Sequence, residues 1–250
     1  MKLKQIYTFN LVKRFCIYVL LLTFEIGLFI LMMKEIKFKE NLNLDYLFAQ
    51  FSQIKYFSLY YIPLFLFVLN NLNILDNYLV FTKYTNIKDW WKEKIKKLMA
   101  ETLIYISIFA SPIIIAVMVN GKKLILSNLK ASIFIIIYFL IVFMLFCVVG
   151  VIYLITSFTF KKQYIGFAIS FLVGSLDFLL SLFKYYNFAM TTSGMLADFI
   201  LSFRFPLKKF LFLQFIYVGY FIMFFILLNF ISCTILEKSD LYRGDIKLER

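Results

Sequence analysis

The chain has 250 residues, of which 63% are hydrophobic and 16% are charged, and its mean hydropathy is +0.86. An ordinary soluble domain carries roughly 45–50% apolar residues, so the composition excludes a soluble enzyme, a disordered tail and a secreted disulfide scaffold. The chain has no histidine, which excludes histidine-ligated zinc sites and Ser-His-Asp triads. Its net charge of +13, in an integral membrane protein, indicates cytoplasmic loops and contact with anionic lipid rather than nucleic acid.

Six apolar runs are long enough to cross the hydrocarbon core of a bilayer, which takes about 20 helical residues. They predict transmembrane helices over 15–33, 56–82, 98–119, 131–160, 163–183 and 210–236. No Pro/Gly/Ser-rich linker divides the chain. The predicted fold is therefore a single all-α membrane domain over 1–250 with six spans. The three cysteines lie inside apolar runs, so we expect small buried side chains rather than metal ligands.

The distribution of positive charge predicts the orientation of these spans. One set of intervening segments holds 16 Lys and Arg in 45 residues: 1–14, 83–97, 161–162 and 237–250. The other set holds 11 in 59 residues: 34–55, 120–130 and 184–209. Because basic loops stay on the cytoplasmic side, both termini are expected in the cytoplasm.

The first run contains an acidic residue, Glu25, near its middle. A charged side chain at this depth costs about 2.5–3.5 kcal/mol to insert, so we expect Glu25 to be protonated or paired within the bundle. It is interpreted either as a structural polar contact or as part of a substrate pathway or gate.

The second run carries three asparagines, Asn70, Asn73 and Asn77, which fall on one helix face. Amide side chains are costly when they face lipid, so this face is expected to turn inward. It either forms hydrogen bonds between helices or lines the inner mouth of a transport route.

The segment between the second and third runs, 83–97, is both basic and aromatic and contains both tryptophans of the chain. Asn86 and Asp89 suit a helix start, because oxygen side chains there complement the positive end of the helix dipole. Apolar side chains then fall near one face and lysines on the other, which predicts an amphipathic helix along the inner membrane surface. It is interpreted as a lipid anchor or as a docking helix for a cytoplasmic partner.

The six spans, the amphipathic N-terminus, this basic helix and a tight hairpin between spans 4 and 5 together resemble a type-2 ABC transporter permease. More narrowly, the run 81–94, FTKYTNIKDWWKEK, resembles the Trp-Trp-containing loop of small permeases found with bacterial peptide and bacteriocin export or immunity systems. The topological resemblance covers the whole chain, and the motif covers about 14 residues.

The resemblance implies a half-transporter: two six-span subunits would pair, as a homodimer or a heterodimer, and sit on separate ATP-binding subunits. ATP and Mg would then be held by those partners, and no cofactor is expected in this chain, which has no P-loop motif. In that family the helix after span 2 and the span 4–5 hairpin contact the ATPases, which corresponds here to Asn86–Lys97 and Ser157–Gln163. The residues expected to couple are Asn86, Ile87, Asp89, Trp90, Trp91, Lys94, Lys161 and Lys162.

The end of the fourth run is marked by Lys161 and Lys162, which cannot lie at mid-membrane, so we expect a tight hairpin there. In the fifth run Gly166, Ser170 and Gly174 recur every four residues and form one small-residue face. Such a face serves internal packing or pairs two subunits, and the resembled family buries span 5 at its dimer seam. We expect short re-entrant or interfacial helices in 184–209.

These features predict the permease subunit of an ATP-driven exporter in the bacterial plasma membrane, moving an amphipathic or hydrophobic peptide for export or self-immunity. The chain itself is not expected to be an enzyme. Two alternatives remain: a secondary transporter or channel working alone, and a non-transporting immunity or scaffold protein. A stand-alone transporter or channel predicts several charged residues near the middle of the membrane. An immunity or scaffold protein predicts that no ATPase subunit accompanies the chain.

Overall fold

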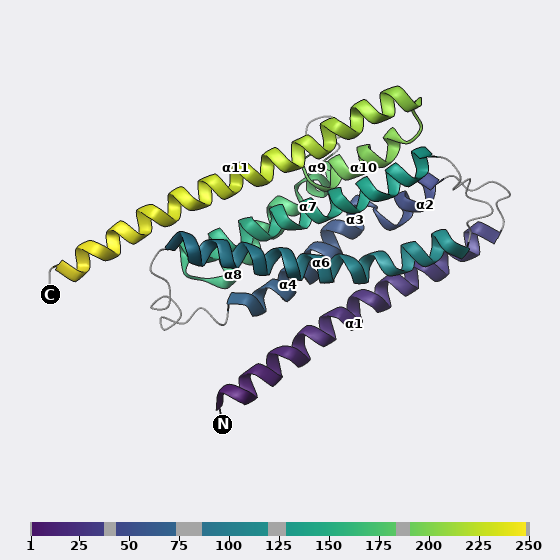
Figure 1. Cartoon of the computed structure of the whole chain (residues 1–250). Coiled ribbons are helices and arrows are strands. Elements are labelled where there is room, and N and C mark those ends of the chain that lie inside the picture. The colour runs from purple at the N-terminus through teal and green to yellow at the C-terminus, as the bar shows by residue number, and fades with distance from the viewer. Residues whose placement is uncertain (1, 38–43, 74–86, 120–128, 184–190, 249–250) are drawn as a thin grey trace.

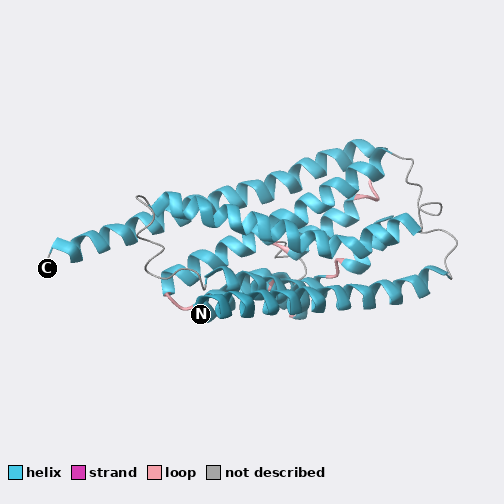
Figure 2. Cartoon of the chain, turned by 60° about the horizontal axis from the view of Figure 1, so that its bottom comes forward, coloured by secondary structure: helices cyan, strands magenta, loops and turns pink. Residues whose placement is uncertain are grey.

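The computed structural model describes residues 2–37, 44–73, 87–119, 129–183 and 191–248, and within these ranges all regular elements are helices. Figure 2 shows them side by side as one bundle. In chain order they are α1 (Lys2–Lys37), α2 (Leu44–Phe51), α3 (Ile54–Tyr56), the π-helix η1 (Phe57–Tyr61), α4 (Ile62–Asn73), α6 (Ile87–Val119), α7 (Leu129–Phe160), α8 (Gln163–Gly174), α9 (Leu176–Leu182), α10 (Ser193–Ser202) and α11 (Leu207–Leu248). The all-α prediction is confirmed for this part of the chain.

Five stretches of helix are long and apolar enough to cross a membrane: Val12–Lys34, Leu44–Asn70, Lys88–Val119, Leu129–Phe160 and Leu207–Lys238. A sixth is present if α8 and α9, which are bent by 58° at Gly174–Ser175, count as one broken span. The chain is therefore compatible with a multi-pass membrane protein.

Both chain termini lie at the same end of the bundle (Figure 1). This termini end also contains the start of α6 and the turn between α7 and α8, whereas the opposite end contains the start of α2 and the start of α11. A chain that crosses the membrane an even number of times has both termini at the same end of its bundle. The cytoplasmic location of the termini end stays a prediction.

The centre of the bundle is α7, which packs against α4, α6, α8, α10 and α11. In its most apolar stretch 61% of the residues are buried, against 17% in α1, which lies at the edge of the bundle. Large aromatic side chains of α7 fill the core: Phe134, Tyr138, Phe146 and Tyr153 are fully buried. Because it has few buried residues, α1 is held to the bundle along one narrow face.

The second span begins at Leu44, twelve residues before the predicted start at Tyr56. The helix α2 buries its apolar face within the bundle, and its Asp45 accepts a hydrogen bond of 2.6 Å from Arg204 Nε. This ion pair compensates the buried carboxylate, so a segment expected as an outer loop becomes part of the bundle. The short helix α10 agrees with the short helices expected in 184–209.

The basic segment after the second span is not a separate surface helix. Ile87–Val119 forms one uninterrupted helix, α6, of 33 residues, which at 1.5 Å per residue is about 50 Å long. Its first three turns extend the third span beyond the apolar stretch, because Trp90 and Trp91 pack on the bundle and hold the helix in line. The amphipathic helix predicted along the membrane surface is thus the beginning of α6.

Candidate functional site

The start of α6 and the α7–α8 turn, which are separated by about 70 residues in sequence, lie together at the termini end. The Trp90 ring centroid is 5.4 Å from that of Phe158, near the end of α7. Trp90 and Trp91 are 4% and 2% exposed, so the two indoles face the bundle rather than lipid. The two regions expected to contact an ATPase are thereby brought side by side.

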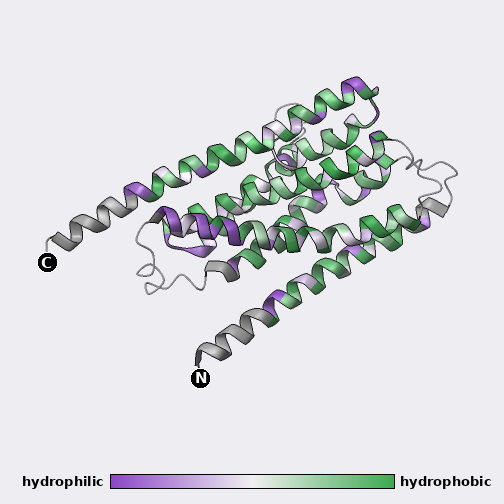
Figure 3. Cartoon of the chain, viewed as in Figure 1, coloured by the Kyte–Doolittle hydropathy of each residue, from purple (hydrophilic) through white to green (hydrophobic). Residues whose placement is uncertain are grey.

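Lysines surround these buried indoles. Six of them are exposed, and we refer to them together as the basic end surface: Lys88, Lys92, Lys96, Lys97, Lys161 and Lys162. Figure 3 shows that hydrophilic residues gather at the termini end, in the first turns of α6 and in the α7–α8 turn, next to the apolar bundle. Lys94 is buried instead, with Nζ 5.7 Å from the Trp90 ring centroid, a cation–π contact.

The predicted hairpin between spans 4 and 5 is confirmed. Only Lys161 and Lys162 separate α7 from α8, and Lys161 has φ of 53°, the left-handed conformation that reverses the chain direction. Both lysines are exposed. The turn therefore presents two positive charges outward from a rigid support of two packed helices.

The other residues predicted to contact the ATP-binding subunit are described only in part. Asp89 is exposed at the start of α6 and pairs with Lys92 at 3.4 Å. Lys88 forms a 2.5 Å ion pair with Glu237, which fastens the start of α6 to α11. Of Ile87 only the backbone is described, and Asn86 lies outside the described residues.

A second candidate region surrounds Glu25, which α1 turns into the bundle with an exposed fraction of 0%. The Tyr61 hydroxyl faces the Glu25 carboxyl. Within the described residues neither carboxyl oxygen has a hydrogen-bond partner of normal geometry, and the Tyr61 hydroxyl has none. Buried polar groups are almost always hydrogen-bonded, so this exception is a candidate for function.

Tyr61 ends the π-helix η1, where the chain makes a wider turn than in an α-helix. Such turns are rare and are frequent at functional sites. The hydroxyl of Tyr105 in α6 donates a hydrogen bond of 2.8 Å to the Tyr61 carbonyl. The π-helix thus directs the Tyr61 side chain toward α1 while its backbone is fixed to α6.

The predicted asparagine face is described at one of its three positions. Asn70 Oδ1 accepts a hydrogen bond of 3.0 Å from the Tyr153 hydroxyl of α7. This contact corresponds to the structural alternative, a hydrogen bond between helices. The side chain of Asn73 and all of Asn77 lie outside the described residues.

The small-residue face of α8 is occupied within the chain. Gly166, Ser170 and Gly174 are buried, and α8 makes its most extensive contact with α7. A Cβ atom added at Gly166 would lie 2.9 Å from the backbone nitrogen of Ser157, so the two helices approach as closely as glycine allows. These contacts support the internal-packing alternative, and the pairing of two subunits through this face stays a prediction.

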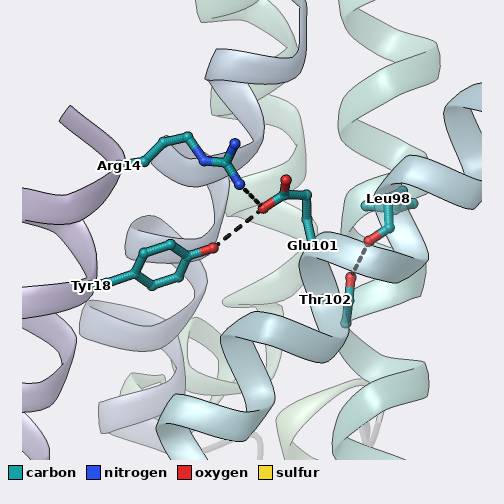
Figure 4. Close-up of polar contacts among 5 residues, drawn as sticks. All are labelled: Arg14, Tyr18, Leu98, Glu101 and Thr102. Atoms are coloured by element: carbon teal, nitrogen blue, oxygen red, sulfur yellow. Dashed lines mark hydrogen bonds and ion pairs between the residues drawn. The ribbon is translucent and has the colours of Figure 1, made fainter. Parts of the chain in front are cut away.

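The sequence analysis did not single out the ion pair between Arg14 of α1 and Glu101 of α6. Arg14 donates a short hydrogen bond to Glu101 Oε2, and the Tyr18 hydroxyl donates another to the same oxygen at 3.3 Å (Figure 4). Glu101 lies near the start of the predicted third span, and its position in an apolar run was the available signal. The pair fixes α1 to α6 on the termini side of Glu25.

A second unpredicted centre is Asp177, at the break between α8 and α9. Its carboxylate is 4% exposed and accepts hydrogen bonds of 3.0, 2.8 and 2.7 Å from the backbone nitrogens of Thr191, Thr192 and Gly194. These nitrogens lie at the N-terminus of α10, where unsatisfied N–H groups favour an anion. Asp177 therefore holds α10 to the broken span. Lys184, the other titratable group near the end of the fifth run, lies outside the described residues.

The described part of the chain contains no group of three or more Cys, Asp or Glu side chains arranged to hold a metal ion. The two regions with unusual chemistry are the basic end surface and the Glu25–Tyr61 pair. No family model, no curated protein and no solved structure matches the chain.

Proposed function

We propose that the chain is the membrane-spanning subunit of an ATP-driven bacterial exporter, with ATP hydrolysed by a separate cytoplasmic subunit. The proposed cargo is an amphipathic or hydrophobic peptide. The observation that carries the proposal is the basic end surface, which combines the start of α6 with the α7–α8 turn around two buried indoles. Two segments distant in sequence form one rigid, charged surface at a bundle end, as a docking site for a soluble partner requires.

The geometry of α6 supports the coupling step of this proposal. The helix runs without interruption from the basic end surface to Val119, so a displacement of its first turns moves the whole span. The ion pairs Lys88–Glu237 and Arg14–Glu101 connect α6 to α11 and to α1. ATP-driven closure of the partner would thus be transmitted to the two peripheral helices and open or close the bundle.

The pairing with a second permease subunit is also proposed. The burial of the small-residue face of α8 against α7 favours other surfaces for this pairing. Apolar surfaces open to such a partner include the outer faces of α1 and α11, which carry many exposed large side chains. Lipid covers the parts of these faces that no second subunit occupies. The excess of lysine at the bundle ends suits anionic lipid headgroups.

A second candidate function, a secondary transporter working alone, is favoured by one observation, the buried Glu25 carboxyl, which has no ion-pair partner among the described residues. Ionisable groups inside a bundle mark ion or proton pathways in many transporters. The two candidates differ in whether an ATPase subunit accompanies the chain. A non-transporting immunity or scaffold protein shares the prediction of no such subunit.

The test is an affinity purification of the tagged chain from detergent-solubilised native membranes, with ATPase activity measured in the eluate. The variant Lys161→Glu/Lys162→Glu reverses two exposed charges of the basic end surface. Its matched control, Lys208→Glu/Lys209→Glu, reverses two adjacent exposed charges at the opposite end of the bundle.

We expect the first pair to lower the co-purified ATPase activity about tenfold or more, because like-charge contacts in an interface are costly. The control pair should leave it unchanged. Wild-type chain that purifies without any P-loop subunit would contradict the ATP-driven proposal and favour the stand-alone alternatives.

A further inference from the structure

We propose that Glu25 is a proton-exchange site that controls whether α1 is seated on the bundle. The inference concerns residues of this chain alone, and it holds whether transport is driven by ATP or not. It rests on the burial of Glu25, on the groups around it, on a cavity beside it and on the narrow attachment of α1.

Among the described residues, no positively charged group faces Glu25. Its carboxyl faces the phenol of Tyr61, and the phenols of Tyr105 on α6 and Tyr138 on α7 are the next titratable groups. These phenols are neutral over the ordinary pH range. Phe24, stacked on Tyr60 with ring centroids 4.2 Å apart, adds an apolar wall beside it.

The charged groups on the helices packed against α1 interact elsewhere. Glu101 of α6 is paired with Arg14, and Asp45 of α2 with Arg204. Lys55 of α3 is exposed and lies over the Tyr56 ring, with Nζ 4.9 Å from the centroid. A carboxylate enclosed in this way without a counter-charge is strongly disfavoured, so the seated arrangement holds Glu25 as the neutral acid.

A cavity of about 100 Å³ lies about one helical turn from Glu25 along α1, and in this proposal it is the route by which the proton reaches water. Leu28 and Met32 line it, and they share the helix face of Glu25 at spacings of three and seven residues. The other side is formed by α2 and α3, including the polar side chain of Gln50. The volume suffices for about three water molecules. The cavity lies between Glu25 and the end of the bundle opposite the termini, which sets the side from which the proton enters.

The narrow buried seam of α1 around Glu25 makes this helix the element that responds. Within Val12–Lys34 only Leu21, Glu25 and Met32 are buried, and they form a single seam. When α1 moves outward, water reaches Glu25, the proton leaves to that water, and the resulting carboxylate resists reburial. Protonation reverses the sequence, so the seated state is favoured at low pH and lost as pH rises.

The experiment measures the position of α1 by pulsed electron spin resonance in nanodiscs made of phosphatidylglycerol. One nitroxide is attached to the native Cys16, which is exposed on α1, and one to Leu172→Cys, which is exposed on α8, in a Cys233→Ala background. Cys147 is fully buried in α7 and stays unlabelled. The matched control pair, Leu172→Cys with Ile231→Cys on α11 in a Cys16→Ala and Cys233→Ala background, excludes α1.

We expect two distances for the α1 pair, with the ratio of the longer to the shorter population rising about tenfold per pH unit through the transition. Glu25→Gln, which cannot ionise, should show only the shorter distance at every pH, and the control pair should not respond. Infrared spectra should contain a protonated-carboxyl band that Glu25→Gln lacks.

A distance that does not change with pH would overturn the proposal, and so would an unchanged pH response in Glu25→Gln. An ionised Glu25 in the seated state would overturn it as well and would indicate a bound cation instead. No nucleotide or partner subunit is present in this measurement, so it can fail or succeed independently of the ATP-driven function.

Discussion

Asp177 and Glu25 are both carboxyl groups buried in the same bundle, yet their surroundings are opposite. Asp177 accepts hydrogen bonds from three backbone nitrogens at the start of α10, and from the Thr191 hydroxyl at 3.0 Å. Glu25 has no partner of normal geometry among the described residues. A buried carboxylate that accepts several hydrogen bonds stabilises one arrangement of the helices. A buried carboxyl group without hydrogen-bond donors instead favours a change of its protonation state and of the helix that carries it. The comparison separates an architectural carboxylate from a responsive one.

The largest effect is expected at Asp177. The change Asp177→Ala leaves the backbone nitrogens at the start of α10 buried without an acceptor, which should lower the free energy of unfolding by about 3 kcal/mol or more. SDS-induced unfolding, followed by the fluorescence of Trp90 and Trp91, measures this. The exposed Asp89→Ala is the control and should change little. A loss below about 1 kcal/mol at Asp177 would show that α10 is held by other contacts.

An intermediate effect is expected at Glu101, a carboxylate with one charged partner and one phenol. Glu101→Gln should cost about 1–2 kcal/mol, less than a fully buried charged hydrogen bond, because Arg14 keeps partial access to water. A double-mutant cycle with Arg14→Met isolates the pair. Additive losses in the cycle would mean that the pair does not fix α1 to α6.

A smaller effect on stability is expected at Thr192, whose backbone nitrogen donates a hydrogen bond to Asp177. The Thr192 hydroxyl donates a hydrogen bond of 3.1 Å to the carbonyl of Gly174, across the break between α8 and α9. Thr192→Val preserves the shape and removes this bond, so the unfolding free energy should fall by about 1 kcal/mol. Thr192→Ser should retain most of it, and equal losses in both variants would point to packing of the methyl group.

The smallest effect on stability is expected at Glu25. Because the carboxyl has no hydrogen-bond partner of normal geometry among the described residues, Glu25→Leu should leave the unfolding free energy unchanged or raise it by up to about 1 kcal/mol. The same SDS titration measures it, with Leu21→Ala on the same seam as a positive control that should destabilise α1. A loss comparable to that of Asp177→Ala would remove the distinction between the two carboxyls.

The elements that sequence reasoning placed well depend on local patterns. The apolar run of α7 and the charges of Lys161 and Lys162 fix a helix and a turn without reference to any other segment. Glu25 was recognised for the same reason, since its depth follows from its place in the run. Local patterns thus gave the spans and one of the two unusual carboxyls.

What the sequence did not predict depends on partners distant in the chain. The inclusion of α2 in the bundle requires Arg204, 159 residues after Asp45. The spacing of Gly166, Ser170 and Gly174 indicated a close helix contact, but spacing cannot tell a neighbour in the same chain from a second subunit. The role of Asp177 likewise depends on backbone nitrogens 14–17 residues further along the chain.

The break between α8 and α9 also has a consequence for biosynthesis. Twelve residues of α8 rise about 18 Å, short of the roughly 30 Å hydrocarbon core, and Asp177 follows at a cost of about 2.5–3.5 kcal/mol for insertion at mid-depth. This segment is therefore a poor independent signal for the translocon. We expect it to enter the membrane as the second arm of a hairpin with α7 and to reach its final form only after α10 has been synthesised.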